Sequence, residues 1–326
     1  MKVGDLGERK LLRHLRDRFP RLSMIGDDAV DLPPLSCPVV TTDSFFEGSH
    51  FYRWWCDPSI LGRRLVEATL SDLAAMGASP GWTLCALACP ADTDLHWLEG
   101  FYEGLLSRSD NLIAGGETVS SPVLGVTLTA IGDGQDPDQL FRRSLLAPGD
   151  RLWITGRIGR ALDAPALLEA CGGLHGDELL PARPTGPDSL EQLRAFLQPR
   201  AAFGAVRAIR GRGVRCAIDV SDGLFSEAAH LAAESGVDVA VDLDSVPFFS
   251  SVADRPVEAA SSGEDFVLLF GASAGVSFED VGFPCVGAAS KGEGKLSVRL
   301  GGREVEPGTR GYDHFRDASR ELRVES

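Results

Sequence analysis

The sequence predicts a two-domain protein of mixed α/β (α+β) class, and three observations support this fold class. The chain has 326 residues, which is enough for about two domains. Short β-rich segments bounded by turn residues are mixed with longer segments of helical periodicity. A loop rich in Pro, Gly and charged residues, "DGQDPDQLFRRSLLAPGD" at 133–150, separates two such sets. We therefore predict domains at residues 1–136 and 137–326.

Strands are predicted where β-branched and apolar residues lie between turn residues: 37–43, 83–89, 125–132, 151–155, 216–220, 239–243, 266–270 and 296–300. Helices are predicted where apolar residues recur every three to four positions: 5–18, 58–76, 95–107, 160–171, 200–210 and 223–235. Asp57 and Pro58 are typical of a helix start, with Asp57 as the cap, and Gly77 is typical of a helix end. We interpret 171–189, which is rich in Gly and Pro, as a loop within the second domain.

Composition excludes several classes of protein. The net charge is −15 at pH 7, which argues against a broad surface for nucleic acid or for an anionic membrane. The sequence contains no apolar signal core and no apolar run long enough to span a bilayer, so we expect a cytoplasmic protein. It also lacks C-x-x-C and H-E-x-x-H, so a zinc site has no support, whereas a hard cation held by oxygen ligands remains open.

Carboxylates recur beside glycines and hydroxyls next to apolar segments. The motifs are "IGDDAV" (25–30), "TTD" (41–43), "LSDLAAMGA" (70–78), "GGET" (115–118), "IDVSDG" (218–223) and "SSGEDF" (261–266). Taken singly, each is also explained by turn chemistry, and Asp72 by a helix-end acid bound to backbone. Taken together, they predict Mg²⁺ ions that join carboxylates to the phosphates of a nucleotide.

Other nucleotide-binding and catalytic signatures are missing or incomplete. There is no G-x-x-x-x-G-K-[ST] loop, no G-x-G-x-x-G and no H-R-D with D-F-G. One G-x-S-x-G match, "GASAG" at 271–275 around Ser273, follows a predicted strand, but "VSFEDVGFP" after it is a poor helix. We therefore interpret it as a surface loop rather than a hydrolase nucleophile.

The motifs, in their order, resemble those of bacterial thiamine-monophosphate kinases. The resemblance covers nearly the whole chain, through "TTDSFFEGSHF" (41–51), "LSDLAAMGASP" (70–80), "RRSLLAPGDRLWITGRIG" (142–159), "AIDVSDGL" (217–224), "SSGEDFVLLF" (261–270) and "GYDHF" (311–315). Aminoimidazole-ribonucleotide synthetase belongs to the same superfamily. The resemblance implies a two-domain subunit whose amino-terminal strands form a barrel across a homodimer. It also implies ATP-dependent phosphorylation of thiamine monophosphate to thiamine diphosphate, with several Mg²⁺ ions and an accessory K⁺.

The resemblance also implies a role for individual positions. The implied metal ligands are Asp28, Thr41, Thr42, Asp43, Asp72, Glu117, Asp219 and Asp222. Gly116, Arg143 and Ser221 match nucleotide-binding positions, and His50, Glu264 and Tyr312 match positions that contact the thiamine phosphate. No residue is expected to act as a covalent nucleophile, because phosphoryl transfer is catalysed by alignment and by charge neutralisation.

Four positions depart from the family pattern. Glu117 stands where an aspartate is usual, Thr69 replaces an asparagine, Gln198 replaces an arginine and Ser262 replaces a glycine. These departures leave two alternatives open. One is a relative that acts on another small-molecule phosphate, and the other is a nucleotide-binding protein without kinase activity.

Overall fold

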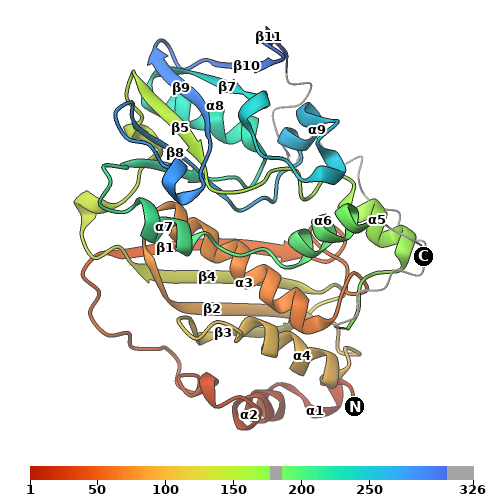
Figure 1. Ribbon diagram of the computed structural model, residues 1–326. Helices are drawn as coiled ribbons and strands as arrows, with labels where there is room; N and C mark the ends of the chain where they lie inside the picture. Colours follow the sequence, from red (N-terminus) through yellow and green to blue (C-terminus); the bar gives the residue numbers. More distant parts are fainter. Residues whose placement is uncertain (177–185, 307–326) are drawn as a thin grey trace.

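The computed structural model describes residues 1–176 and 186–306, and their strands form two sheets (Figure 1). The first sheet has the order β1-β4-β2-β3 and contains β1 (Pro38–Phe46), β2 (Ser79–Cys89), β3 (Leu112–Ser120) and β4 (Gly125–Asp133). The second sheet has the order β11-β10-β7-β9-β5-β8-β6. It contains β5 (Asp150–Ile154), β6 (Cys216–Asp219), β7 (Val237–Asp242), β8 (Leu268–Ser273), β9 (Cys285–Lys291), β10 (Leu296–Leu300) and β11 (Arg303–Glu304).

The α-helices are α1 (Val3–Leu6), α2 (Glu8–Arg18), α3 (Pro58–Ala75), α4 (Leu95–Leu105), α5 (Ala164–Cys171), α6 (Pro187–Leu197), α7 (Phe203–Ile209), α8 (Leu224–Ser235) and α9 (Pro256–Ser261). All eight predicted strands are present, and each predicted helix corresponds to a helix of the structure, the first of them interrupted at Gly7. The strands β3, β9 and β11 and the helices α6 and α9 were not predicted. The boundary predicted at 136/137 falls in the connection between β4 and β5, so each sheet lies within one predicted domain.

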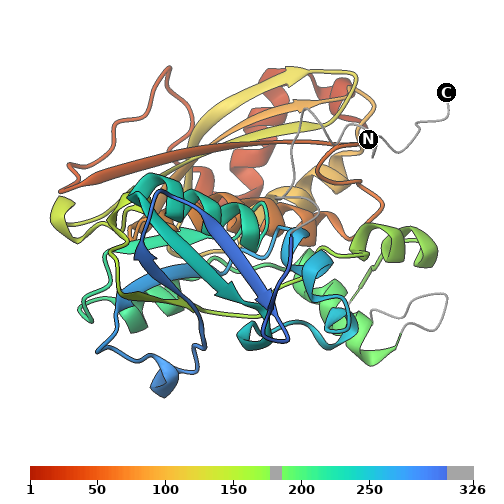
Figure 2. The same cartoon turned by 90° about the horizontal axis from the view of Figure 1, so that it is seen from above.

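Helix α3 lies where the two halves of the chain meet. It packs on the first sheet, and it also contacts β6 of the second sheet and the helices α6 and α7 (Figures 1 and 2). Because neighbours cover it on several sides, polar side chains such as Arg64, Glu67 and Ser71 are buried along with its apolar ones. Polar groups in such a place need partners, so α3 is where contacts between the two halves are expected.

The start of α3 differs in one respect from the prediction. Pro58 occupies the first turn as predicted, but the side chain of Asp57 does not cap the helix. Its carboxylate accepts a 2.7 Å hydrogen bond from the N–H of Gly176 instead. The helix ends as predicted at Gly77, where φ is +72°, a backbone conformation that favours glycine.

Strand β1 presents alternate residues to opposite sides of the first sheet. Thr41 and Asp43 are partly buried, whereas Val40 and Thr42 are exposed. Since successive side chains of a strand point to opposite faces, Thr41 and Asp43 share the face covered by α3 and Thr42 lies on the other. No helix within 1–176 and 186–306 is long and apolar enough to cross a membrane.

Candidate active site

Asp72, in the last turn of α3, is the centre of the candidate site. Its carboxylate accepts a 2.5 Å hydrogen bond from the hydroxyl of Thr41 on β1. Both residues line a cavity of about 270 Å³ together with Val39, Val40, Leu73, Ala75, Met76, Arg143 and Ala217. Residues from β1, α3, β6 and the segment before β5 therefore meet at this cavity.

Asp219, at the end of β6, brings a second carboxylate to α3. It is only 2% exposed, and one carboxylate oxygen accepts a 2.7 Å hydrogen bond from the hydroxyl of Ser71. The other oxygen, Oδ1, is buried and has no hydrogen-bond partner among the described residues. Burial, followed by the negative charge of Asp72, raises the pKa of Asp219 to about 7. A buried oxygen without a donor is the kind of atom that a cation would satisfy.

Asp43 and Asp72 complete a group of three interacting carboxylates. Burial and then the charge of Asp72 raise the pKa of Asp43 to about 6. Burial also raises the pKa of Asp72, although the hydrogen bond from Thr41 and the charge of Arg143 oppose that rise. Burial is the largest cause of all three shifts, and neighbouring carboxylates add to each of them. A bound cation would offset both effects by favouring the ionised carboxylates.

The protein alone does not build a closed metal cage there. In residues 1–176 and 186–306, no three His, Cys, Asp or Glu side chains converge closely enough to hold a metal ion. Mg²⁺ commonly takes one or two carboxylates and completes its shell with water and substrate phosphate. The observed donors fit that mode of binding rather than a structural metal site.

Other residues predicted as metal ligands are not shown to join this group. Thr42 lies on the opposite face of β1, where its hydroxyl is 3.0 Å from that of Thr129. Asp28 is exposed in a segment without regular secondary structure. Glu117 is exposed on β3, and its own carboxylate accepts a 2.8 Å hydrogen bond from the N–H of Thr118. Glu117 borders a different cavity, of about 110 Å³, with Phe46, Ala86, Leu87, Ala88, Val119, Gly125 and Thr127.

Gly116, a predicted nucleotide-binding residue, lies directly against the neighbouring strand β2. A Cβ atom at this position would be 1.8 Å from the carbonyl oxygen of Cys85. Only glycine allows the backbone of β3 to approach β2 this closely. The third predicted nucleotide-binding residue, Ser221, lies with Asp222 in the loop between β6 and α8.

The predicted substrate-binding residues come from both halves of the chain. The ring nitrogen Nδ1 of His50 accepts a 3.1 Å hydrogen bond from the N–H of Phe46. Glu264 precedes β8, and its N–H donates a 2.6 Å hydrogen bond to the carbonyl of Ser221. Glu264, predicted to bind the thiamine substrate, and Ser221, predicted to bind the nucleotide, are therefore in direct contact through their backbones. Tyr312 lies outside the described residues.

Glu227, in the first turn of α8, is a buried acid that sequence reasoning missed. Its carboxylate accepts a 3.3 Å hydrogen bond from the N–H of Asp222, and it lies 3.3 Å from Nδ1 of His230. Its charge adds to the rise in the pKa of Asp72 and of Asp219. The available signal was an acid four residues after the glycine of "SDG", in the first turn of a predicted helix.

Two of the four departures from the family pattern are accommodated locally, and a third leaves a buried hydroxyl without a partner among the described residues. Ser262 has φ −79°, which does not require glycine, and its hydroxyl donates to the carbonyl of Ala259 at 2.9 Å. Gln198 follows α6, and its N–H donates to the carbonyl of Arg194 at 2.9 Å. Thr69 is buried in α3 near the carboxyl of Asp43, and its hydroxyl has no hydrogen-bond partner among the described residues. Ser273, the last residue of β8, is followed by a turn rather than by a helix, so no nucleophile elbow forms.

Comparison with known families accounts for most of this architecture. The family described as "AIR synthase related protein, N-terminal domain" matches residues 26–133, and "AIR synthase related protein, C-terminal domain" matches residues 147–280. A thiamine-monophosphate kinase of Escherichia coli K12 is 33% identical over 95% of this chain and 98% of its own. One of Salmonella typhimurium is 32% identical over the same shares of the two chains. This chain belongs to the thiamine-monophosphate kinase family.

Solved structures agree with membership of the thiamine-monophosphate kinase family. The structure named "AaThiL complexed with AMPPCP and TMP" is 27% identical and aligns with a TM-score of 0.74 over 97% of this chain and 99% of its own. Thiamine-monophosphate kinase from Stenotrophomonas maltophilia is 30% identical and also gives a TM-score of 0.74, over 92% and 98% of the two chains. The hydrogenase maturation protein HypE in complex with ATP has 17% identity and a TM-score of 0.68, which shows a shared fold alone.

Proposed function

We propose that this protein transfers the terminal phosphoryl group of ATP to the phosphate of thiamine monophosphate, giving ADP and thiamine diphosphate. The observation that carries the proposal is the interacting carboxylate group of Asp43, Asp72 and Asp219. Its member Asp72 lines, together with Arg143, a cavity where the two halves of the chain meet. An enzyme of this kind needs cations to bring two phosphate groups together. The names of the relatives, and the AMPPCP and TMP of the AaThiL complex, supply the substrates.

Several Mg²⁺ ions are part of the proposal, and Asp43, Asp72 and Asp219 are the residues best suited to hold them. When bound, Mg²⁺ would neutralise charge on the transferring phosphoryl group. The unsatisfied Oδ1 of Asp219 and the raised pKa values at this site support that role. By family resemblance, we extend the metal-binding set to Asp28, Thr41, Thr42, Glu117 and Asp222, with K⁺ as an accessory cation. Because the side chain of Thr42 points away, its contribution would come from the backbone.

The chain's own residues would align the two substrates. The guanidinium of Arg143 can donate to phosphate oxygens, Gly116 leaves room for close approach, and Ser221 supplies a hydroxyl. On the acceptor side we assign His50, Glu264 and Tyr312 to thiamine monophosphate. No side chain is assigned as a covalent nucleophile, so the phosphoryl group passes directly from donor to acceptor.

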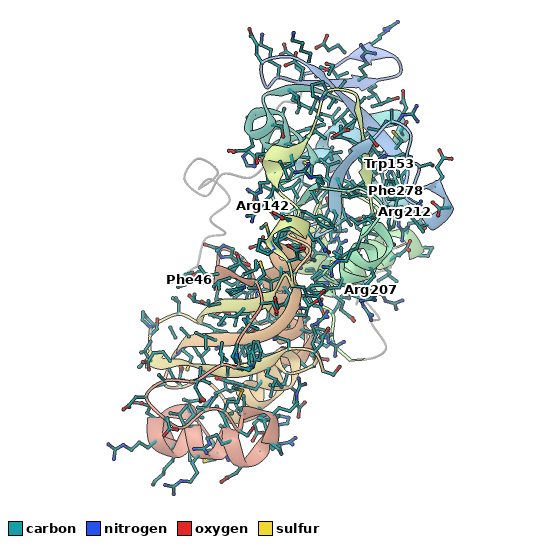
Figure 3. The ribbon with its side chains drawn as sticks, turned by 90° about the vertical axis from the view of Figure 1, so that its left-hand side faces the viewer. Phe46, Arg142, Trp153, Arg207, Arg212 and Phe278 are labelled. Atoms are coloured by element: carbon teal, nitrogen blue, oxygen red, sulfur yellow. The ribbon has the colours of Figure 1, made fainter. Side chains whose placement is uncertain are left out.

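The functional unit that we propose is a homodimer whose amino-terminal strands form a barrel. Its support is the face of the first sheet that points away from α3. Val40 and Phe46 on β1 and Val119 on β3 are 61%, 45% and 48% exposed, which is unusual for large apolar residues of one sheet. Figure 3 shows Phe46 and Arg207 of α7 on opposite sides of the molecule. A second copy of the sheet would cover these side chains.

The deciding experiment is chromatographic detection of thiamine diphosphate after incubation with Mg²⁺, ATP and thiamine monophosphate. We expect product from the wild-type protein and a loss of about a hundredfold or more in Asp43→Asn. Asp17→Asn, a change of the same kind at an exposed position on α2, is the matched control and should retain activity. ATP binding without product in the wild type would instead favour a nucleotide-binding protein without kinase activity.

A further inference from the structure

The loop that carries Glu264 has an unusual backbone. Gly263, Glu264 and Phe266 have φ values of +73°, +54° and +47°, and two of these residues are not glycine. Such conformations are disfavoured for side-chain-bearing residues and persist only where their surroundings enforce them. Here the N–H groups of Glu264 and Phe266 donate to the carbonyls of Ser221 and Val220 at 2.6 and 2.8 Å. The backbone of Glu264 is therefore fixed against the loop after β6.

The side chain of Glu264 is held from the other half of the chain. Nη2 of Arg64, on α3, donates to both carboxylate oxygens of Glu264 at 2.9 Å. The side chain of Arg64 is only 3% exposed, whereas that of Glu264 is 37% exposed. The cation is thus buried beneath a carboxylate that keeps part of its surface open to solvent.

Arg64 is itself held in place by the end of α6. Its Nη1 donates to the carbonyl of Phe196, and its guanidinium lies 4.1 Å from the centre of the Phe196 ring. The Phe196 ring in turn contacts Trp55, at 5.6 Å between ring centres. These contacts leave Arg64 little freedom, because its guanidinium lies over the Phe196 ring and also donates to a carbonyl.

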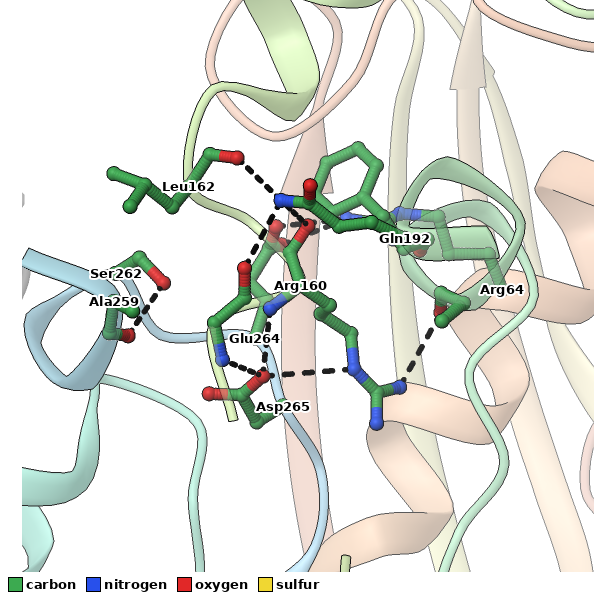
Figure 4. A network of polar contacts seen from close by, with 11 residues as sticks. Arg64, Arg160, Leu162, Gln192, Ala259, Ser262, Glu264 and Asp265 are labelled. Carbon is green, nitrogen blue, oxygen red and sulfur yellow. Dashed lines mark hydrogen bonds and ion pairs between the residues drawn. The ribbon is translucent and has the colours of Figure 1, made fainter. Parts of the chain in front are cut away.

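Asp265, the acid next to Glu264, pairs with a different arginine. The two acids have separate partners, which argues that the pairing of Glu264 with Arg64 is specific. Asp265 is fully buried and accepts hydrogen bonds from the N–H groups of Gly159 and Arg160 at 2.9 and 3.0 Å. Nε of Arg160 lies 3.7 Å from the same carboxylate, and its Nη1 donates at 3.3 Å to the carbonyl of Ala195. The two arginines therefore bind successive carbonyls at the end of α6 (Figure 4). Of the two carboxylates, that of Glu264 is partly open to solvent and that of Asp265 is not.

We propose that Arg64 is a positioning residue for recognition of thiamine monophosphate, acting through the carboxylate of Glu264. This inference rests on the proposed function. Arg64 orients the open side of the carboxylate toward the positively charged ring of the substrate, and it does so from the half of the chain that also carries Asp72. Without Arg64, the carboxylate would be free to adopt several rotamers, and part of the binding energy would be spent in ordering it.

The test is steady-state kinetics of Arg64→Met, with both substrates varied. We expect KM for thiamine monophosphate to rise about tenfold, while kcat and KM for ATP change by less than about twofold. Arg64→Lys, which keeps the charge, should recover most of the loss. Arg63→Met, the neighbouring change on α3, is the matched control, since the ion pair with Glu264 is made by Arg64.

A double-mutant cycle separates positioning from a purely structural role. In a Glu264→Gln background, Arg64→Met should change KM for thiamine monophosphate by less than about twofold, although the melting temperature still falls. An unchanged KM in Arg64→Met, or effects that add fully in the double variant, would overturn the proposal. If Arg64→Met does not fold, Arg64→Gln, which keeps a donor for the carbonyl of Phe196, carries the same expectation.

Failure of the proposed function is distinguishable from failure of this inference. Failure of the proposed function would appear as absence of thiamine diphosphate in the wild-type reaction, before any variant is compared. Calorimetric titration of the wild-type protein and Arg64→Met with thiamine monophosphate alone then still tests the positioning role. Equal affinities in that titration would overturn it.

Discussion

The N–H of Glu264 donates a 2.6 Å hydrogen bond to the carbonyl of Ser221. This bond joins the segment assigned to the thiamine substrate to the segment assigned to nucleotide and metal. A displacement of either segment is therefore transmitted directly to the other. Precise relative placement of two substrates is what phosphoryl transfer requires, because the protein does little covalent chemistry.

The first prediction concerns pH and Mg²⁺. Asp43 and Asp219 have pKa values raised to about 6 and 7, above the value of about 3.9 expected in the unfolded chain. The folded metal-free protein thus holds protons more tightly than the unfolded chain does. Its unfolding free energy should fall by several kcal/mol, about 1.4 kcal/mol for each unit by which a pKa is raised, as pH rises from about 4 to above 7.

Added Mg²⁺ should reverse this trend, because its binding requires ionised carboxylates. Thermal melts from pH 5 to 8.5, in EDTA and in excess Mg²⁺, measure both effects. In Asp219→Asn the decline with pH should be reduced. A metal-free protein whose melting temperature increases across this range would show that the carboxylates are not under-neutralised.

The second prediction concerns Gly116. The added Cβ of Gly116→Ala would lie 1.8 Å from the carbonyl oxygen of Cys85, so β3 must move away from β2. We expect a loss of about 2 kcal/mol or more in unfolding free energy and a raised KM for ATP. Gly115→Ala is the matched control, since its Cβ would meet only the Leu84 side chain at 3.4 Å. Urea unfolding compares the two variants, and equal stabilities would contradict the steric argument.

The third prediction concerns the exposed face of the first sheet. Phe46→Glu places a charge on an apolar surface, so it should convert a dimer to a monomer in size-exclusion chromatography with light scattering. Val281→Glu alters another exposed apolar residue, on a short helix next to the second sheet, and should leave the mass unchanged. A monomeric wild-type protein would remove the basis for the barrel.

The fourth prediction concerns Ser71, which hydrogen-bonds to Asp219 across the two halves. Ser71→Ala leaves both oxygens of a buried carboxylate without a protein donor. We expect a loss of about 1–2 kcal/mol in unfolding free energy in the absence of Mg²⁺, and a smaller loss in its presence. Ser109→Ala, at an exposed position, is the control in urea titrations. A loss that does not depend on Mg²⁺ would argue against a metal ion at Asp219.

Most of the fold was predictable from the sequence because its main elements have strong local patterns. The strand β3 was missed because its glycines resemble a loop, whereas in the structure they allow close pairing with β2. The strand β9 consists largely of small residues without alternation, and α6 begins inside a segment dominated by Pro and Gly. In each case contacts distant in sequence outweigh local preference.

The candidate site was predictable only in part, for a related reason. Acids beside glycines and hydroxyls marked Asp43, Asp72 and Asp219. Asp72 and Asp219 lie at the ends of α3 and β6, and Asp43 lies within β1. Arg64 carried no comparable signal, because its partner Glu264 is 200 positions away. The opposite orientation of Thr42 follows from strand alternation and could have been anticipated from the sequence.

Helix α3 fixes the distance between two parts of the candidate site, in addition to making contacts with both halves of the chain. Arg64, which holds Glu264, and Asp72, which belongs to the carboxylate group, are separated by about 12 Å along one continuous helix. The helix therefore fixes the spacing between the residue that we propose positions the ring-binding carboxylate and the carboxylate group that we propose handles phosphate. Inserting one residue between them would turn Asp72 by about 100° around the helix axis. The ends of the site would then no longer match an acceptor of fixed size, even with every side chain still present.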